Sequence, residues 1–249
     1  MKVIKTASPN IISDNTVMPR AMILAAGRGK RLRPLTDKTP KPLVKLNGKP
    51  LIVYHLEKLA KAGVQEVVIN TAWLPEQFPE NLGDGSQFGL KIFYSEEPEG
   101  GLETAGGVVN ALPILGDKPF VLVNSDIYSE LDYADWVRKA QQMPERCLAH
   151  LCLVPVPDFK DTGDFDLDLH ADSPDMLAIG NHWTFSGVSV CSPKLFSGLT
   201  PDFIPLAPIL REAALRQRIS GEVFTGFWSD IGTQQRLQDA ENYVKQHAN

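Results

Sequence analysis

The most constraining feature of this 249-residue chain is a short apolar run, residues 22–26, that stops abruptly at a cationic loop. The run is typical of a buried β-strand, and it is followed by Gly27-Arg28-Gly29-Lys30-Arg31, which is too polar and flexible to be buried. Glycine allows unusual backbone conformations and lets backbone N–H groups approach an anion closely. Although the chain has a formal net charge of −5, residues 28–41 contain six cationic side chains. The stretch therefore predicts a phosphate-binding loop.

Two common phosphate-binding motifs do not match this loop. The Walker motif ends in Gly-Lys-Ser/Thr, whereas Gly29-Lys30 is followed by Arg31. The dinucleotide-binding motif needs a third glycine, whereas position 32 is leucine. A nucleotide bound here must be held by another kind of loop.

Helical and strand patterns alternate along the rest of the chain. Strands are expected at residues 66–70, 91–94, 120–124, 147–154, 182–190 and 223–228. Helices are expected from Pro50 to Gly63, at 75–82, after the glycines at 106–107, at 132–142, at 205–216 and after Thr233, which would cap the last of them. This alternation predicts an α/β, Rossmann-like fold, in which a mostly parallel sheet is flanked by helices.

The segment 155–175 departs from that alternation because it is rich in aspartate and poor in large apolar residues. It predicts a small β-rich hairpin lobe that stands off the sheet. Residues 182–190 then alternate, and we expect Trp183, Phe185 and Val188 to face the core of a half-buried strand.

Length and composition fit one domain over residues 21–249, preceded by a flexible N-terminal extension over residues 1–20. No apolar run reaches the roughly 20 residues that cross a bilayer, and the first residues lack a signal-peptide pattern. Cys147, Cys152 and Cys191 have no Cys-x-x-Cys spacing, so we expect buried thiols in a reducing cytoplasm. We expect neither a membrane nor a nucleic-acid partner.

A longer pattern around the loop resembles the nucleotidyltransferases that act on sugar 1-phosphates. It reads Leu24-Ala25-Ala26-Gly27-x-Gly29-x-Arg31-x-Arg33-Pro34-Leu35-Thr36, followed by Pro40-Lys41-Pro42-Leu43. Later matches are Leu102-x-Thr104-Ala105-Gly106, Thr184-Phe185-Ser186-Gly187 and Trp228-x-Asp230-Ile231-Gly232-Thr233. The resemblance covers about residues 21–243 and implies the GT-A-like fold of nucleotide-diphospho-sugar transferases, whose smaller lobe binds the sugar.

The resemblance also implies a role for each matching residue. Arg33 and Lys41 would be catalytic. Nucleotide binding would fall to Leu24, Ala25, Ala26, Gly27, Arg28, Gly29, Lys30 and Arg31, and at the base to Glu103, Thr104, Ala105 and Gly106. Sugar-phosphate binding would fall to Asn124, Asp126, Asp164, Thr184, Ser186 and Gly187. Asp126 and Asp230 would bind a metal ion.

The two aspartates each follow a predicted strand, and ligands of open α/β sheets bind beyond the carboxyl ends of the strands. Two such carboxylates repel each other unless a cation lies between them, and Mg²⁺ prefers carboxylate and phosphate oxygens. We therefore expect Asp126 and Asp230 to share Mg²⁺. Ser125 stands where the family usually has glycine, so serine is unfavourable if that position requires a positive φ or close contact with the nucleotide.

The implied activity is transfer of a nucleoside monophosphate from a nucleoside triphosphate to a sugar 1-phosphate, in a monomer or small homo-oligomer. The short chain, the Gly-Leu-Glu-Thr segment and the Gly-Asp-Phe turn most resemble the branch that transfers UMP from UTP to N-acetylmuramate α-1-phosphate in peptidoglycan recycling. The lactyl carboxylate of that sugar needs a donor or cation, for which Lys160, Asn181 and His182 are candidates. Transfer to mannose or glucose 1-phosphate by a guanylyl-, thymidylyl- or uridylyltransferase stays open, as does a non-catalytic subunit that binds sugar nucleotides.

Overall fold

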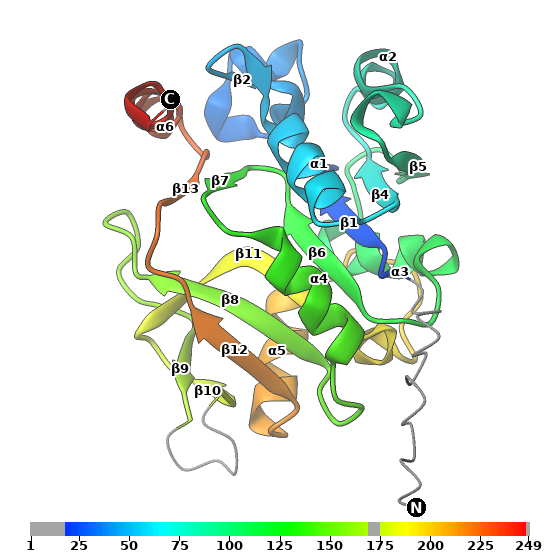
Figure 1. Ribbon diagram of the computed structural model, residues 1–249, viewed down its shortest axis with the longest axis vertical. Helices are drawn as coiled ribbons and strands as arrows, with labels where there is room; N and C mark the ends of the chain where they lie inside the picture. The colour runs from blue at the N-terminus through cyan, green and yellow to red at the C-terminus, as the bar shows by residue number, and fades with distance from the viewer. Residues whose placement is uncertain (1–17, 169–174, 248–249) are drawn as a thin grey trace, which may run out of the picture.

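The computed structural model describes residues 18–168 and 175–247, within which a nine-stranded sheet is covered by helices on both faces (Figure 1). β1 (Ala21–Leu24) lies between β4 (Glu66–Thr71) and β6 (Phe120–Asn124) and is parallel to both. β5 (Lys91–Glu96) extends this parallel part beyond β4. The predicted α/β fold with a helix-flanked sheet is confirmed.

Alternate residues of the central strands supply two separate cores. Ile23 and its neighbours pack against α1 (Leu51–Lys61) and α4 (Tyr133–Gln142) on one face. Met22 and its neighbours pack against α3 (Glu103–Leu115) and α5 (Leu206–Leu215) on the other. Because both faces are buried, the strands are continuous apolar runs rather than alternating ones.

The second half of the sheet is mixed rather than parallel. β11 (Trp183–Cys191) runs antiparallel between β6 and β8 (Ala149–Pro155), and β12 (Ile219–Val223) pairs in parallel with β8. β11 is not half-buried as predicted: Thr184 and Ser186 are buried, while Trp183 and Phe185 are only partly buried. The alternation was misleading because β11 is a central strand that is covered on both faces.

The predicted lobe over 155–175 is a hairpin, but it does not stand off the sheet. β9 (Phe165–Leu167) and β10 (Leu177–Ile179) pair with each other, and Phe165 also pairs with Trp183 of β11. The hairpin therefore continues the edge of the main sheet. Part of the predicted lobe, residues 169–174, lies outside the described residues.

The prediction of a strand at 223–228 was wrong, because two short strands flank that segment instead. β12 ends at Val223, and β13 (Trp228–Asp230) pairs antiparallel with β7 (Ile127–Ser129) in a separate ribbon. The sequence of β12, Ile-Ser-Gly-Glu-Val, has little apolar character, so its pairing with β8 was not visible locally.

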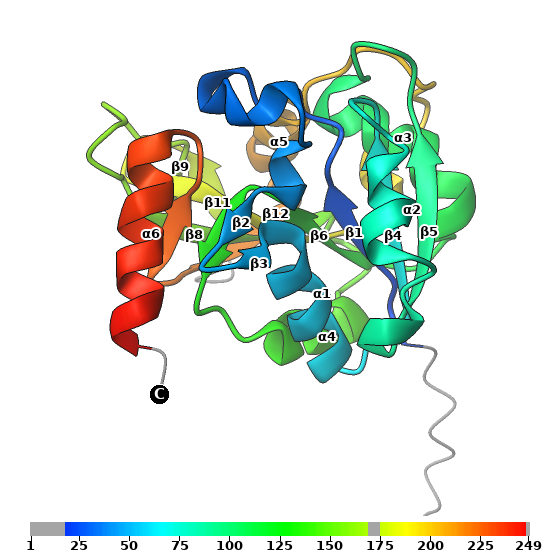
Figure 2. The ribbon, with the colours of Figure 1, turned by 90° about the horizontal axis from the view of Figure 1, so that it is seen from above.

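The remaining elements lie around the carboxyl ends of the strands and at the end of the chain. They are α2 (Gln77–Leu82), the small ribbon of β2 (Lys45–Leu46) and β3 (Lys49–Pro50), and α6 (Gln234–His247), which lies at one side of the molecule in Figure 2. Thr233 caps α6 as predicted, since its Oγ1 accepts a hydrogen bond from Arg236 N at 3.3 Å.

The predicted N-terminal extension falls mostly on residues 1–17, which lie outside the described residues. Its last residues belong to the fold: Met18 packs against the core, and Arg20 forms an ion pair of 2.5 Å with Glu66. Cys147, Cys152 and Cys191 are free and buried, as predicted. Within the part of the chain that the structure describes, no helix combines the length and hydropathy needed to cross a bilayer.

Candidate active site

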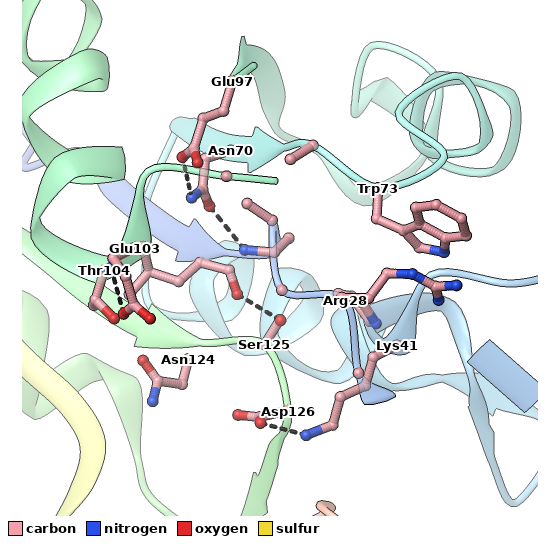
Figure 3. A pocket seen from close by; sticks show the side chains of 18 of the residues that line it. Arg28, Lys41, Asn70, Trp73, Glu97, Glu103, Thr104, Asn124, Ser125 and Asp126 are labelled. Carbon is pink, nitrogen blue, oxygen red and sulfur yellow. Dashed lines mark hydrogen bonds and ion pairs between the residues drawn. The ribbon is translucent and has the colours of Figure 1, made fainter. Parts of the chain in front are cut away.

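A cavity of about 690 Å³ opens at the carboxyl ends of β1, β4 and β6 (Figure 3). Its lining includes many of the residues predicted to bind substrates. These are Leu24, Ala25, Ala26, Gly27, Arg28, Gly29, Lys30, Arg31, Lys41, Glu103, Thr104, Asn124 and Asp126. Segments separated by a hundred residues thus meet in one place.

The conformation of the predicted phosphate-binding loop depends on glycine at position 29. Gly29 has a φ of 64°, and a Cβ added there would lie 2.9 Å from Lys41 Cβ and 3.0 Å from Thr36 Cγ2. Gly27 has neither a positive φ nor a neighbouring atom within 4 Å of such a Cβ. Gly29 therefore lets the loop turn tightly over the side chain of Lys41.

Lys41 places a buried ammonium group between the two predicted metal ligands. Its side chain is 10% exposed; Nζ forms an ion pair with Asp126 Oδ2 and lies 4.0 Å from Asp230 Oδ1. The low polarity around a buried charge strengthens its interaction with nearby anions. The sequence had placed these three residues in one site, and the structure brings them together.

Asp230 reaches the site through the β7–β13 ribbon. It pairs with Ile127, the residue after Asp126, and Ile231 N donates to Asp126 O at 2.8 Å. Asp230 Oδ2 accepts a hydrogen bond from Arg236 Nη1 at 2.9 Å. Its Oδ1 is buried and has no hydrogen-bond partner in residues 18–168 and 175–247, so this atom can take a further ligand.

Arg31, rather than the predicted Arg33, faces the cavity. Arg31 lines it, and its Nη2 lies 3.9 Å from Asp230 Oδ2. Arg33 is outside the lining, and its Nε pairs with Asp37 at 2.7 Å. The catalytic role of Arg33 stays a prediction; buried Leu32, which anchors the short turn, lies between the two arginines in the chain.

Two buried polar side chains that the sequence analysis missed connect the phosphate-binding loop to the start of α3. Ala25 N donates to Asn70 Oδ1 at 2.8 Å, and Asn70 Nδ2 donates to Glu97 Oε1 at 2.7 Å (Figure 3). Glu97 Oε2 accepts from Leu102 N at 2.8 Å, and burial raises the pKa of Glu97. Asn70 and Glu97 lie at the carboxyl ends of β4 and β5, so the rule that predicted Asp126 could have found them.

The predicted base-binding segment divides into two pairs of residues. Glu103 and Thr104 line the cavity, and Glu103 has a φ of 61°, which is rare for a residue with a side chain. Ala105 and Gly106 are outside the lining and donate their backbone N–H groups to Ile204 O at 2.9 and 3.1 Å. They anchor the segment rather than line the cavity.

Another wall is aromatic. The guanidinium of Arg28 lies 3.4 Å above the ring of Trp73, and both side chains donate hydrogen bonds to Thr36 O. Trp73 and Phe203 line the cavity, and the sequence analysis predicted neither of them.

The predicted sugar-binding residues do not all reach the cavity. Asn124 lines it, and Gly187, with a φ of 88°, leaves room for Asn124 because a Cβ would lie 2.7 Å from its Nδ2. Thr184 and Ser186 are buried in β11, outside the lining. Asp164 is also outside; it binds Lys160 at 2.6 Å and accepts from Phe185 N at 3.0 Å, so its contacts hold the hairpin to β11.

Ser125 is compatible with the backbone at its position. It does not adopt a positive φ, and its hydroxyl donates to Leu24 O at 2.5 Å. The serine therefore links β6 to β1 without backbone strain. Because φ is not positive here, the backbone conformation does not disfavour serine in place of glycine.

These features define a nucleotide-binding α/β enzyme with a cationic, carboxylate-lined cavity. The family model described as nucleotidyl transferase matches residues 20–169, and the chain belongs to this family. It is 48% identical over 223 residues to N-acetylmuramate alpha-1-phosphate uridylyltransferase of Neisseria meningitidis serogroup B, covering 89% of this chain and 96% of that relative. The enzyme of the same name from Caulobacter vibrioides is 33% identical over 234 residues, covering 89% and 95%.

The fold has a solved counterpart. A candidate glucose-1-phosphate thymidylyltransferase from Bacillus anthracis, solved in complex with sucrose, superposes with a TM-score of 0.81 at 22% identity. The match covers 92% of this chain and 96% of that one. The fold is therefore the GT-A-like fold expected from the sequence.

Proposed function

We propose that this protein transfers UMP from UTP to N-acetylmuramate α-1-phosphate, in the cytoplasm and as a step of peptidoglycan recycling. The observation that carries the proposal is the placement of Lys41 between Asp126 and Asp230 beside the phosphate-binding loop. The uridylyltransferase relatives support the choice of substrates, because the aligned part covers 95% or more of their length.

The reaction needs positioning and positive charge rather than a general base. A phosphate monoester has a second pKa of about 6, so the acceptor phosphate is mostly dianionic at pH 7 and is itself the nucleophile. Its oxygen attacks the α-phosphorus of UTP, the bond to the β-phosphate oxygen breaks, and pyrophosphate leaves with both electrons of that bond. Lys41 and Arg31 reduce the repulsion between the two anions, and the loop at Gly29 holds the triphosphate.

Asp126 and Asp230 would hold Mg²⁺. The buried Oδ1 of Asp230 has no hydrogen-bond partner among the described residues, and carboxylate oxygens are ligands that Mg²⁺ prefers. When bound, Mg²⁺ would neutralise phosphate charge. These two side chains would hold the ion next to the loop, and Arg236 orients Asp230 through its 2.9 Å hydrogen bond.

A screen of pyrophosphate release tests the proposal. UTP, CTP, GTP and dTTP are each combined with the 1-phosphates of N-acetylmuramate, N-acetylglucosamine, mannose and glucose. The highest kcat/KM is expected for UTP with N-acetylmuramate 1-phosphate. Equal or better turnover of another hexose phosphate would contradict the substrate assignment, and nucleotide binding with no pyrophosphate from any pair would identify a non-catalytic subunit.

A further inference from the structure

Phe159 is an exposed aromatic side chain that lies outside the cavity lining but contacts a residue beside the candidate metal site. It is 52% exposed and belongs to the segment between β8 and β9. The centroid of its ring lies 3.9 Å from Cζ of Arg236, so this segment lies next to the start of α6 (Figure 2). An aromatic face attracts a cation, and the attraction is stronger where water is excluded. The ring therefore packs on a charged group rather than in the apolar core.

The guanidinium of Arg236 is enclosed on several sides. Its Nη1 donates to Asp230 Oδ2 at 2.9 Å, and its Nε donates to Thr233 Oγ1 at 3.4 Å. A Cβ added to Gly232 would lie 2.2 Å from Arg236 Nη2, so the backbone of this glycine is in close contact with the guanidinium. With Phe159 on the ring side, the side chain of Arg236 is only 14% exposed. Because water is largely excluded, the ion pair with Asp230 is stronger than it would be at the surface.

This ion pair fixes one carboxylate oxygen of Asp230 and leaves the other available. Oδ2 accepts from Arg236, whereas Oδ1 is buried and has no hydrogen-bond partner among the residues that the structure describes. Side chains that hold a metal ligand in place set its orientation, and their loss typically lowers metal affinity by about 10- to 100-fold. Phe159 covers the guanidinium and so contributes to the orientation of Asp230 without touching it.

The segment that carries Phe159 is itself held in place. Lys160 N donates to Pro157 O at 2.9 Å, which closes a turn around residue 159. Lys160 Nζ pairs with Asp164 Oδ2 at 2.6 Å, and the same oxygen accepts from Phe185 N of β11 at 3.0 Å. The turn is thus attached to the main sheet, and little conformational freedom remains to be lost when the ring makes its contact.

We propose that Phe159 is a positioning residue for the candidate metal site. By covering Arg236, it holds Asp230 in the orientation that binds a divalent cation. The proposal rests on the proposed function, because it takes Asp126 and Asp230 as the ligands of that cation. Since Phe159 reaches the site only through Arg236, its removal should weaken cation binding only while the arginine is present.

Titration of the full chain with Mn²⁺ at saturating UTP, followed by electron paramagnetic resonance, tests the proposal. A titration of UTP without protein gives the Mn²⁺ that the nucleotide holds alone. Phe159→Ala should lower the affinity for Mn²⁺ by about 3- to 5-fold, the scale of one cation–aromatic contact. Phe159→Tyr keeps the ring and should stay within about twofold of wild type. Leu215→Ala is the matched control, because Leu215 is 68% exposed and lies outside the cavity lining.

Arg236→Ala separates an effect through the arginine from a general effect on the fold. This variant should lower the affinity for Mn²⁺ by about 10-fold or more. Adding Phe159→Ala to it should cause no further loss, because two residues that act through one contact are non-additive.

Every other outcome overturns the proposal. Unchanged Mn²⁺ affinity in Phe159→Ala would mean that the ring does not act on the site. A further loss of the same size in the Arg236→Ala background, or an equal loss in Phe159→Tyr, would mean that it does not act through its face on the arginine. These results leave the proposed function standing. Wild-type protein that binds no more Mn²⁺ than UTP alone contradicts the metal site and the proposal together, whereas a different acceptor contradicts only the function, because the titration contains no sugar phosphate.

Discussion

At the scale of single residues, Lys41 concentrates the positive charge of the cavity. It is buried, it contacts Asp126, and its aliphatic part packs under Gly29. The side chain therefore has two functions that can be separated. Its methylene groups pack against the loop, and its ammonium group attracts the negative charges nearby.

Lys41→Met keeps most of the packing volume and removes the charge. We expect kcat/KM to fall by about 10²-fold or more, the scale of losing one preorganised charged contact. Asp126 loses a partner but remains 31% exposed, so solvation limits the loss and the melting temperature should change by only a few degrees. Steady-state pyrophosphate release and a thermal melt measure the two effects; near-normal turnover would exclude a catalytic role.

Arg31 and Arg33 form a matched pair for testing which cation faces the substrates. Arg31→Ala should lower kcat/KM by about 10²-fold, because Arg31 lines the cavity beside Asp230. The kcat/KM of Arg33→Ala should stay within about threefold of wild type. Arg33 forms an exposed ion pair with Asp37, and such pairs contribute little to stability. A larger loss in the Arg33 variant would support the role that the sequence pattern implied.

At the scale of elements, the β7–β13 ribbon completes the candidate metal site. It joins a segment after β6 to one about a hundred residues later, and its register puts Asp230 opposite Ile127. The ribbon brings Asp230, from a distant segment, close to the ammonium group of Lys41 that Asp126 also contacts.

Asp126→Asn, Asp230→Asn and the double variant test whether the carboxylates act as a unit. Each single change should weaken Mn²⁺ binding, measured directly by electron paramagnetic resonance in the presence of UTP, and should reduce turnover strongly. The double variant should be little worse than either single one, because residues that act together are non-additive. If both losses are mild and multiply in the double variant, the two carboxylates act separately.

Elements with a strong local pattern were predictable from the sequence, and elements defined by pairing were not. β6 matches its predicted bounds because Phe-Val-Leu-Val is an apolar run that is buried on both faces. β12 and β13 depend on partners far away in the chain, and their own residues are weakly apolar. The cationic loop was predictable from its own residues, whereas the expectation that Lys41 and both aspartates share one site came from the family resemblance. Phe203, which lines the cavity, belongs to no motif and was missed.

At the scale of the whole molecule, a buried histidine ties two helices of one core together. His55 on α1 lies 2.8 Å, through Nδ1, from the hydroxyl of Tyr133 on α4. Burial, and to a lesser extent the positive charge of Lys58, lowers the pKa of His55 to about 4. At neutral pH the imidazole is therefore uncharged, and charging it opposes folding.

The stability of the protein should consequently decrease as the pH is lowered from about 6.5 to about 4. The unfolded chain takes up a proton near the ordinary pKa of about 6.5, whereas the folded chain resists it until about pH 4. Stability is thus fully present above pH 6.5 and is lost as the pH falls toward 4, by on the order of 3 kcal/mol. The expectation is measured as the free energy of unfolding in urea at pH 7, 5.5 and 4.

His55→Gln isolates this contribution from that of the carboxylates, which titrate in the same range. Glutamine retains a hydrogen-bonding group for Tyr133 but has no proton to gain, so the variant should be less stable at pH 7 and lose less stability on acidification. The difference in the free energy of unfolding between wild type and variant should therefore narrow by on the order of 3 kcal/mol from pH 7 to pH 4. His247→Gln, on the exposed end of α6, is the control and should follow the wild-type profile. Parallel profiles for wild type and His55→Gln would show that the buried imidazole does not control the acid sensitivity of the fold.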